Sequence, residues 1–394
     1  MGLPEYLSGG RIQGRSDDTA PASSVQATSW KLLYDSGDVT SSTAEYLSDT
    51  FAARDHLMII NAGDSGTSGG TMQMYFSNSS TSPATNTTDY NTGYSSFADA
   101  WNYYQGESNI KHFANGVDNV EYQPIFVVGY LNNKDGDRKM WYGDHTWGGR
   151  ESGTTRGNYK VDSGQVLRVK LRKENDDMNN SSHYPHMRLV VLGCDDDESN
   201  STQDIDGDAV NFWQELDSTA WTSGTTIDCN GSGSGFATRR FLMVEITTIG
   251  TGNTVQDITF NGNTNNYRQE LITDWTHTGD EVALGGTGAG TASKIEIYDS
   301  SDSSRTTAHK AAPVKTTRLF INNFEGYDKV FIGNSIDSGS AGAGNAPRST
   351  RIGGRWGDLT GTDVIKRITV TNTGGDGSNT YATGSIVKVY GSKF

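Results

Sequence analysis

The second half of the chain repeats the sequence plan of its first half. Residues 51–59 read FAARDHLMI and residues 236–244 read FATRRFLMV, with five of the nine positions identical. Further matches follow in the same order, with an offset that grows from 183 to 198 residues: Trp30 with Trp213, Phe76 with Phe260, Trp141 with Phe331, and 189–193 with 387–391. A growing offset indicates loops of different length between blocks of constant spacing. A period this long exceeds that of any solenoid, so the pattern predicts two tandem domains from one duplicated module.

The composition favours an all-β fold. The 394 residues suffice for two domains with a core each. Only 33% are hydrophobic, yet 10% are aromatic, which disordered chains lack, and 48 are glycine. Short apolar or alternating runs, such as 125–131 and 165–173, lie between Gly-, Asn- and Asp-rich turns. We expect two β-sandwich, jelly-roll-like domains related by internal duplication.

The polar segments set the expected domain boundaries. Residues 1–28 have no apolar period and are predicted to form an extended N-terminal arm, with Leu3, Tyr6 and Leu7 as its assembly contacts or, alternatively, a frayed end. The first sandwich is expected over 29–194 and the second over 209–394. Residues 195–208 form an acidic linker between them.

Charge and hydropathy limit the partners. The net charge is −15, and an acidic surface repels phosphate backbones, so we expect no nucleic-acid binding. No run approaches the roughly 18 apolar residues of a membrane helix, and the first residues lack an export signal, which predicts no membrane contact and synthesis in the cytoplasm. Cys194 and Cys229 are expected to be free thiols, with their redox state left open.

No motif in the sequence indicates catalysis. The glycine-rich stretches GGTGAG and AGAG lack the Lys-Ser/Thr and the helix that a phosphate loop needs. There is no GxSxG elbow, and the only close histidines, His183 and His186, flank a proline. A glycoside hydrolase needs only two carboxylates and stays open, but the expectation is a protein that is not an enzyme.

The linker carries a candidate cation site. Asp204, Asp206 and Asp208 alternate, and carboxylates in this pattern can wrap a hard cation such as Ca²⁺. The glycine of an EF-hand loop is misplaced here, at Gly207. The alternative is a solvated acidic linker without a cofactor.

An aromatic segment of the first module is the candidate contact surface. Trp and Tyr rings can stack on sugar rings while neighbouring Asn and Asp bind the hydroxyls. The segment lies in an insertion relative to the second module and carries Tyr90, Tyr94, Trp101, Tyr103 and Tyr104. We expect a glycan or partner contact; the alternative is that these rings pack the insertion onto its own sandwich.

Several blocks resemble a known class of proteins. They are GGRIQG near the start, SWKLL at 29–33, DITFNGN at 257–263, an AGAGNAP loop before Arg355-Trp356-Gly357, and the closing TGSIVKVYGS. Together they resemble the tandem-domain structural proteins of marine tailed bacteriophages. The first module departs from the pattern, because Phe76-Ser77-Asn78 lacks the glycine and no AGAG loop is present.

This resemblance implies a component of a phage virion, made in the host cytoplasm. We expect a non-enzymatic surface protein, either a head decoration or a tail or fibre component, that forms a homo-oligomer, most often a trimer in such proteins. It would contact other virion proteins and host surface glycans. The alternatives are a double jelly-roll capsid shell protein and a carbohydrate-binding lectin.

Overall fold

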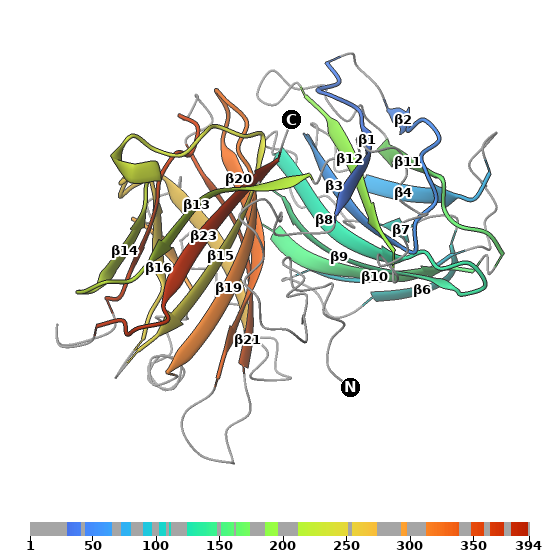
Figure 1. Ribbon diagram of the computed structural model, residues 1–394. Helices are drawn as coiled ribbons and strands as arrows, with labels where there is room; N and C mark the ends of the chain where they lie inside the picture. Colours follow the sequence, from blue (N-terminus) through green and yellow to red (C-terminus); the bar gives the residue numbers. More distant parts are fainter. Residues whose placement is uncertain are drawn as a thin grey trace, which may run out of the picture.

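The chain folds into two β-sandwiches that lie side by side (Figure 1). The computed structural model describes residues 30–40, 44–64, 72–79, 90–96, 102–107, 110–111, 124–147, 151–160, 163–173, 186–195, 212–250, 254–273, 293–297, 313–338, 348–357, 363–373 and 380–392. Within these residues the regular structure is β-strand apart from one turn of 3-10 helix, Gly231–Gly233. The predicted all-β tandem architecture is therefore confirmed.

Each sandwich pairs a large sheet with a small one. In the first module the large sheet has the order β1-β12-β3-β8-β9-β10-β5-β6 and the small sheet the order β2-β11-β4-β7. The strands are β1 (Lys31–Asp35), β2 (Glu45–Leu47), β3 (His56–Asp64), β4 (Met72–Ser77), β5 (Tyr90–Ser96), β6 (Asn102–Glu107), β7 (Ile110–Lys111), β8 (Pro124–Asn132), β9 (Lys139–Trp147), β10 (Glu151–Tyr159), β11 (Arg168–Lys173) and β12 (Arg188–Cys194).

The second module repeats this order. Its large sheet reads β13-β23-β15-β19-β20-β21-β17 and its small sheet β14-β22-β16-β18. The strands are β13 (Trp213–Ala220), β14 (Thr226–Cys229), β15 (Phe241–Ile249), β16 (Asp257–Phe260), β17 (Tyr267–Thr273), β18 (Ile295–Glu296), β19 (Val314–Asn322), β20 (Lys329–Asp337), β21 (Arg348–Trp356), β22 (Ile368–Thr371) and β23 (Ile386–Ser392).

The topology is that of an extended jelly roll. In the second module the four strands β13-β23-β15-β19 face the four strands β14-β22-β16-β18, which is the jelly-roll arrangement of eight strands in two sheets. The hairpin β20–β21 and strand β17 then widen the large sheet beyond β19. The first module has the same extension, with β6 added at its edge.

Strand boundaries confirm the duplication. The pairs β3 and β15, β9 and β20, and β12 and β23 start at the offsets of 185, 190 and 198 residues that the sequence matches give. The aromatic counterparts Phe76 and Phe260 are both fully buried, as are Trp141 and Phe331. The two modules therefore share one strand plan position by position.

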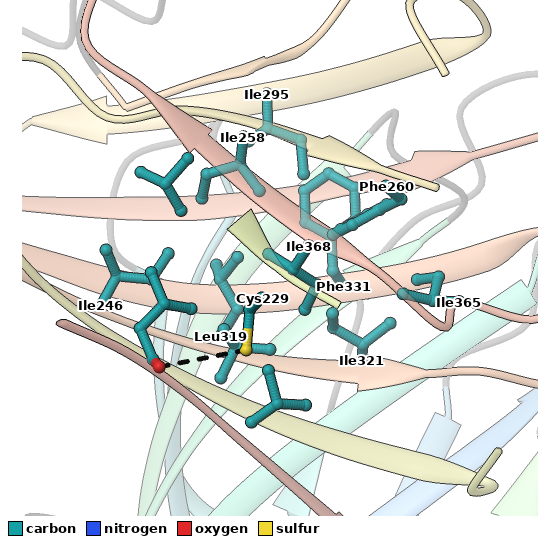
Figure 2. Packing of buried hydrophobic residues seen from close by; sticks show 14 of the residues in the cluster. Cys229, Ile246, Ile258, Phe260, Ile295, Leu319, Ile321, Phe331, Ile365 and Ile368 are labelled. Carbon is teal, nitrogen blue, oxygen red and sulfur yellow. Dashed lines mark hydrogen bonds between the residues drawn. The ribbon is translucent and has the colours of Figure 1, made fainter. Parts of the chain in front are cut away.

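The interior of each sandwich is an apolar core between its two sheets. In the second module, Ile258, Phe260 and Ile295 from the small sheet meet Leu319, Ile321 and Phe331 from the large sheet (Figure 2). Cys229 belongs to this core, with its Sγ 4.0 Å from the carbonyl oxygen of Val387. Strands β14 and β22 of the small sheet alternate buried residues with exposed or partly exposed ones, because one of their faces packs on the core.

The central strands of each large sheet are buried on both faces over much of their length. In β3, Leu57 and Ile59 point into the first sandwich, whereas Met58 and Ile60 belong to a third apolar cluster outside it. This third cluster, called the seam here, joins residues of both modules: Trp30, Met58, Ile60, Ala62, Phe126, Val128, Val190, Leu192, Cys194, Phe212, Trp213, Phe241, Met243, Phe320, Val330, Ile332 and Tyr390. The large sheets thus form the two inner layers of a four-layer stack (Figure 1).

Aromatic pairs organise the seam. Trp30 and Tyr130 of the first module lie with ring centroids 6.0 Å apart and planes tilted by 48°. Their duplicates, Trp213 and Phe320, show the same separation and tilt. Phe126 stacks on Phe241 across the seam at 6.2 Å, so the two modules are joined by aromatic packing as well as by the chain.

Polar contacts flank this apolar centre. Asn334 Nδ2 donates to Asp144 Oδ2 at 3.1 Å, and these two residues occupy equivalent positions of β20 and β9. Burial raises the pKa of Asp144, although Arg351 and the hydrogen bonds from Asn334 and Thr154 act in the opposite direction. A Cβ at Gly353 would collide with Ser152, so only glycine lets β21 pass so close to β10.

One end of the seam carries charge. Arg240 of the second module pairs with Asp38 of the first at 3.3 Å and lies 3.8 Å from the ring centroid of Phe324. His186 packs edge-on against the same ring at 4.5 Å. Burial lowers the pKa of His186 against the attraction of Asp38, which favours the neutral imidazole in this contact.

A buried asparagine performs the same task in each module. Asn133 follows β8, donates to the carbonyls of Arg54 and Val166, and accepts from the Val166 N–H at 2.6 Å. Asn323 follows β19 and makes the equivalent bonds with Arg239 and Ile365. Each amide therefore fastens three chain segments at one end of its sandwich.

Replacement of Asn133 or Asn323 by alanine is expected to cost about 3 kcal/mol of unfolding free energy, because buried backbone groups lose their partners. Urea unfolding followed by tryptophan fluorescence measures this. The control is Asn132→Ala, since Asn132 is only partly buried and its single side-chain bond, to Lys134 N, is 3.4 Å long. Equal effects at positions 132 and 133 would contradict the fastening role.

Ile332→Asp is expected to open the seam. Ile332 is 2% exposed within it, and an unpaired carboxylate there should cost at least about 3 kcal/mol. Calorimetry should then show the modules melting in two separate transitions. Ile336→Asp is the matched control, because Ile336 lies on the same face of β20 but is 50% exposed. A single unshifted transition in both variants would contradict a stabilising seam.

Candidate functional site

The predicted aromatic contact segment forms an outer hairpin of the first module's large sheet. Tyr90 and Tyr94 lie on β5, and Tyr103 and Tyr104 on β6, with Tyr94 paired to Asn102. Among the described strands, β6 has no counterpart in the second module, in line with an insertion. Trp101 and the side chains of these four tyrosines lie outside the described residues, so their contact role stays a prediction.

The other sequence candidates also fall outside the described part of the chain. This applies to the arm residues Leu3, Tyr6 and Leu7 and to the linker carboxylates Asp204, Asp206 and Asp208. Within the described ranges, no group of three or more His, Cys, Asp or Glu side chains is placed to hold a metal ion. The Ca²⁺ hypothesis therefore remains confined to the linker.

Two further expectations concern residues that are described. Cys194 and Cys229 are both buried and unbonded to each other, and burial raises the pKa of the Cys229 thiol to about 12. None of the helices among the described residues is long and apolar enough to cross a membrane.

The described surface has a polar hollow at one end of the second module. Its volume is about 680 Å³, and it lies among the turn after β14, the turn after β16, the β19–β20 turn and the segment before β22. The lining residues are Asn230, Gly233, Ser234, Gly235, Asn261, Glu325, Gly326, Asp363, Val364, Lys366 and Arg367. Sequence reasoning missed this site, because its residues come from four separated turns.

Hydrogen bonds fix the walls of the hollow. Asn230 Oδ1 accepts from the Gly233 N–H at 2.9 Å, and Asn261 Oδ1 accepts from the Lys366 N–H at 2.8 Å. Arg367 pairs with both carboxylate oxygens of Asp228, at 2.7 and 2.8 Å. Burial alone would raise the pKa of Asp228, but the hydrogen bonds with Arg367, Thr369 and Asn230 lower it below its ordinary value. The walls are therefore set before any ligand arrives.

At the same end of the first module, hydrogen bonds join the equivalent turns. There Asp135 Oδ1 accepts from the Gly164 N–H at 2.6 Å, and Asn78 Nδ2 donates to the Ser163 carbonyl at 3.0 Å. Gly164 has φ +75°, a conformation that favours glycine. Asn133 and Asn323 are equivalent, and so are their partners Val166 and Ile365. Counting from these residues, Asp135 corresponds to Glu325 and Gly164 corresponds to Asp363. The second module therefore has two carboxylates, Glu325 and Asp363, where the first module has a hydrogen bond between a carboxylate and a backbone N–H. The hollow lies at this end of the second module.

A buried lysine lies beneath each of these ends. Lys329 Nζ donates to the carbonyl oxygens of Phe324, at 2.7 Å, and Tyr327, and Lys139 caps the equivalent turn of the first module. Burial lowers the pKa of Lys329 to about 8, while Asp328, Asp363 and Glu325 oppose the shift. The repeated pattern Asn-Asn-x-Asp/Glu-Gly-x-x-Lys, at 132–139 and 322–329, is the sequence signal that could have revealed these turns.

Comparisons with known proteins found no relative of this chain. No family model matches it, and neither a curated protein nor a solved structure is significantly similar.

Lys329 gives a pH-dependent prediction. Since its pKa falls from 10.5 to about 8 on folding, the unfolded chain binds more protons between these values, and stability should rise with pH across this window. The difference in urea midpoint between the wild type and Lys329→Met should therefore grow in favour of the wild type from pH 8 to 10. Parallel midpoint curves for the two proteins would contradict the shifted pKa.

Proposed function

We propose that the chain is a non-enzymatic structural protein on the surface of a phage virion, as a head decoration or as a tail or fibre component. The observation that carries the proposal is the seam, in which two jelly-roll modules bury their large sheets against each other. Such a block resists separation of its parts without relying on a partner chain. The sequence resemblance to phage structural proteins supports the same role.

The surface chemistry agrees with assembly among proteins. A net charge of −15 disfavours contact with the packaged nucleic acid and favours an outward position. The outer layers of the stack are the small sheets, in which β14 and β22 alternate buried residues with exposed or partly exposed ones. In this proposal the protein forms a homo-oligomer, a trimer, contacts other virion proteins and reaches host glycans.

Electron microscopy of particles assembled with and without this chain tests the proposal. Loss of projections, with an intact shell, is the expected result for a decoration or fibre protein. Loss of the shell would instead favour the alternative of a double jelly-roll capsid protein. Intact particles that never contain the chain would refute both.

The oligomer is tested separately on the purified full chain. Sedimentation equilibrium should give a mass three times the chain mass of 42.6 kDa. A monomer at micromolar concentration would contradict the trimer and leave the two-module block as the functional unit.

A further inference from the structure

We propose that the hollow at the end of the second module binds a sugar residue through its hydroxyl groups. The inference deepens the contact role in the proposed function and rests on it for the source of the sugar, a host surface glycan. The hollow is distinct from the aromatic segment on β5 and β6, which belongs to the first module.

Size and polarity select the ligand class. A volume of about 680 Å³ lies within the usual range of about 300–1,000 Å³ for small-molecule sites. Among the described residues of the lining, Val364 is the single aliphatic one and none is aromatic. Such walls give an apolar ligand little to bury against, whereas a ligand rich in hydroxyl groups can replace its bonds to water with bonds to protein.

The unengaged side chains supply complementary bonds. Within the described residues, Glu325, Asp363 and Lys366 are exposed, and their side chains make no hydrogen bond or ion pair. The two carboxylates only accept hydrogen bonds and the ammonium group only donates them. Sugar hydroxyls both donate and accept, so one ring can satisfy all three groups at once, with charge-assisted bonds to each.

The backbone allows a ligand to come close. Gly233, Gly235 and Gly326 line the hollow with φ of +104°, +86° and +78°. These conformations favour glycine and present bare backbone to the hollow. Arg367 adds little net charge, because Asp228 pairs with it.

Divergence between the modules marks the hollow as a specific feature. In the first module the Asp135–Gly164 hydrogen bond joins two of the turns at this end of the sandwich. In the second module Asp363 replaces the glycine, and among the described residues no hydrogen bond joins it to Glu325. Like charges on Glu325 and Asp363 further oppose closure. The open form therefore depends on two residues.

Nuclear magnetic resonance of the full-length, ¹⁵N-labelled chain tests the proposal. The probes are methyl glycosides of neutral hexoses and of N-acetylhexosamines, each added alone. The expected result is a saturable shift of the Gly233, Gly235 and Gly326 amide signals by at least one probe, with a Kd on the order of 1 mM, since no ring stacks on the sugar.

Variants separate the hollow from other surfaces. Glu325→Gln and Asp363→Asn should each weaken this binding at least about tenfold, because each removes a charge-assisted acceptor at constant volume. The double variant Glu325→Asp with Asp363→Gly places the residues of the first module, Asp135 and Gly164, at the equivalent positions, and it should abolish binding. Glu215→Gln removes an exposed carboxylate on β13 that is not among the lining residues, and should change nothing.

Three results would overturn the inference: no saturable shift with any probe, shifts that Glu325→Gln and Asp363→Asn leave unchanged, or equal shifts from CaCl₂ without sugar, which would indicate an ion site. Sugar binding by a chain that is absent from particles would leave the inference standing and refute the virion role. Particle incorporation without sugar binding would do the reverse.

Discussion

Exclusion of water from both faces of the central strands of each large sheet is the constraint on which the rest of the structure depends. One face of the sheet packs in a sandwich and the other packs in the seam, so the central strands carry runs of consecutive apolar residues. In β15, for example, Leu242 and Val244 face the sandwich core while Phe241 and Met243 face the seam. Apolar burial at about 25 cal/mol per Å² makes this double use the main source of stability. The jelly-roll order, the hairpin extension and the relative placement of the modules all follow from giving those faces a partner.

The duplication and the apolar strand runs could be predicted from the sequence, but the arrangement of the two modules could not. The runs at 56–60 and 241–244 predict strands buried on both faces, but an apolar run does not say which surface covers it. Strands β5, β10 and β21 are rich in Gly, Ser, Thr and Asn, so they show no run of apolar residues that would predict a strand. Their hydrogen bonds to neighbouring strands define them in the structure. The hollow was equally hidden, since four turns build it and each turn alone is ordinary. Comparison of the twin motif at 132–139 and 322–329 would have shown the exchange of Asp135 for Glu325, but not that of Gly164 for Asp363, which lies outside it.

Comparison of the two modules shows which residues stayed the same after the duplication and which residues changed. Asn133 and Asn323 make the same three side-chain hydrogen bonds to backbone groups in their modules. A substitution at either position would leave these buried backbone groups without a partner. The buried lysines under the hairpin turns are kept for the same reason. By contrast, the pair above them has changed from Asp135 and Gly164 to Glu325 and Asp363, a change that costs the fold little, because both new side chains reach solvent. The two modules therefore differ at solvent-exposed positions and share the buried residues beneath them.

The covalent link between the modules changes how their association responds to dilution. Two separate proteins joined by a seam like this one would exchange partners, and at low concentration they would come apart by mass action. Here the chain between Asp195 and Phe212 keeps each large sheet at a high effective concentration next to its partner, so the pairing is a unimolecular equilibrium. Its one-to-one ratio is also fixed at translation. The seam face is consumed within one molecule, and growth into larger assemblies must use other surfaces, which prevents open-ended stacking of chains through this contact.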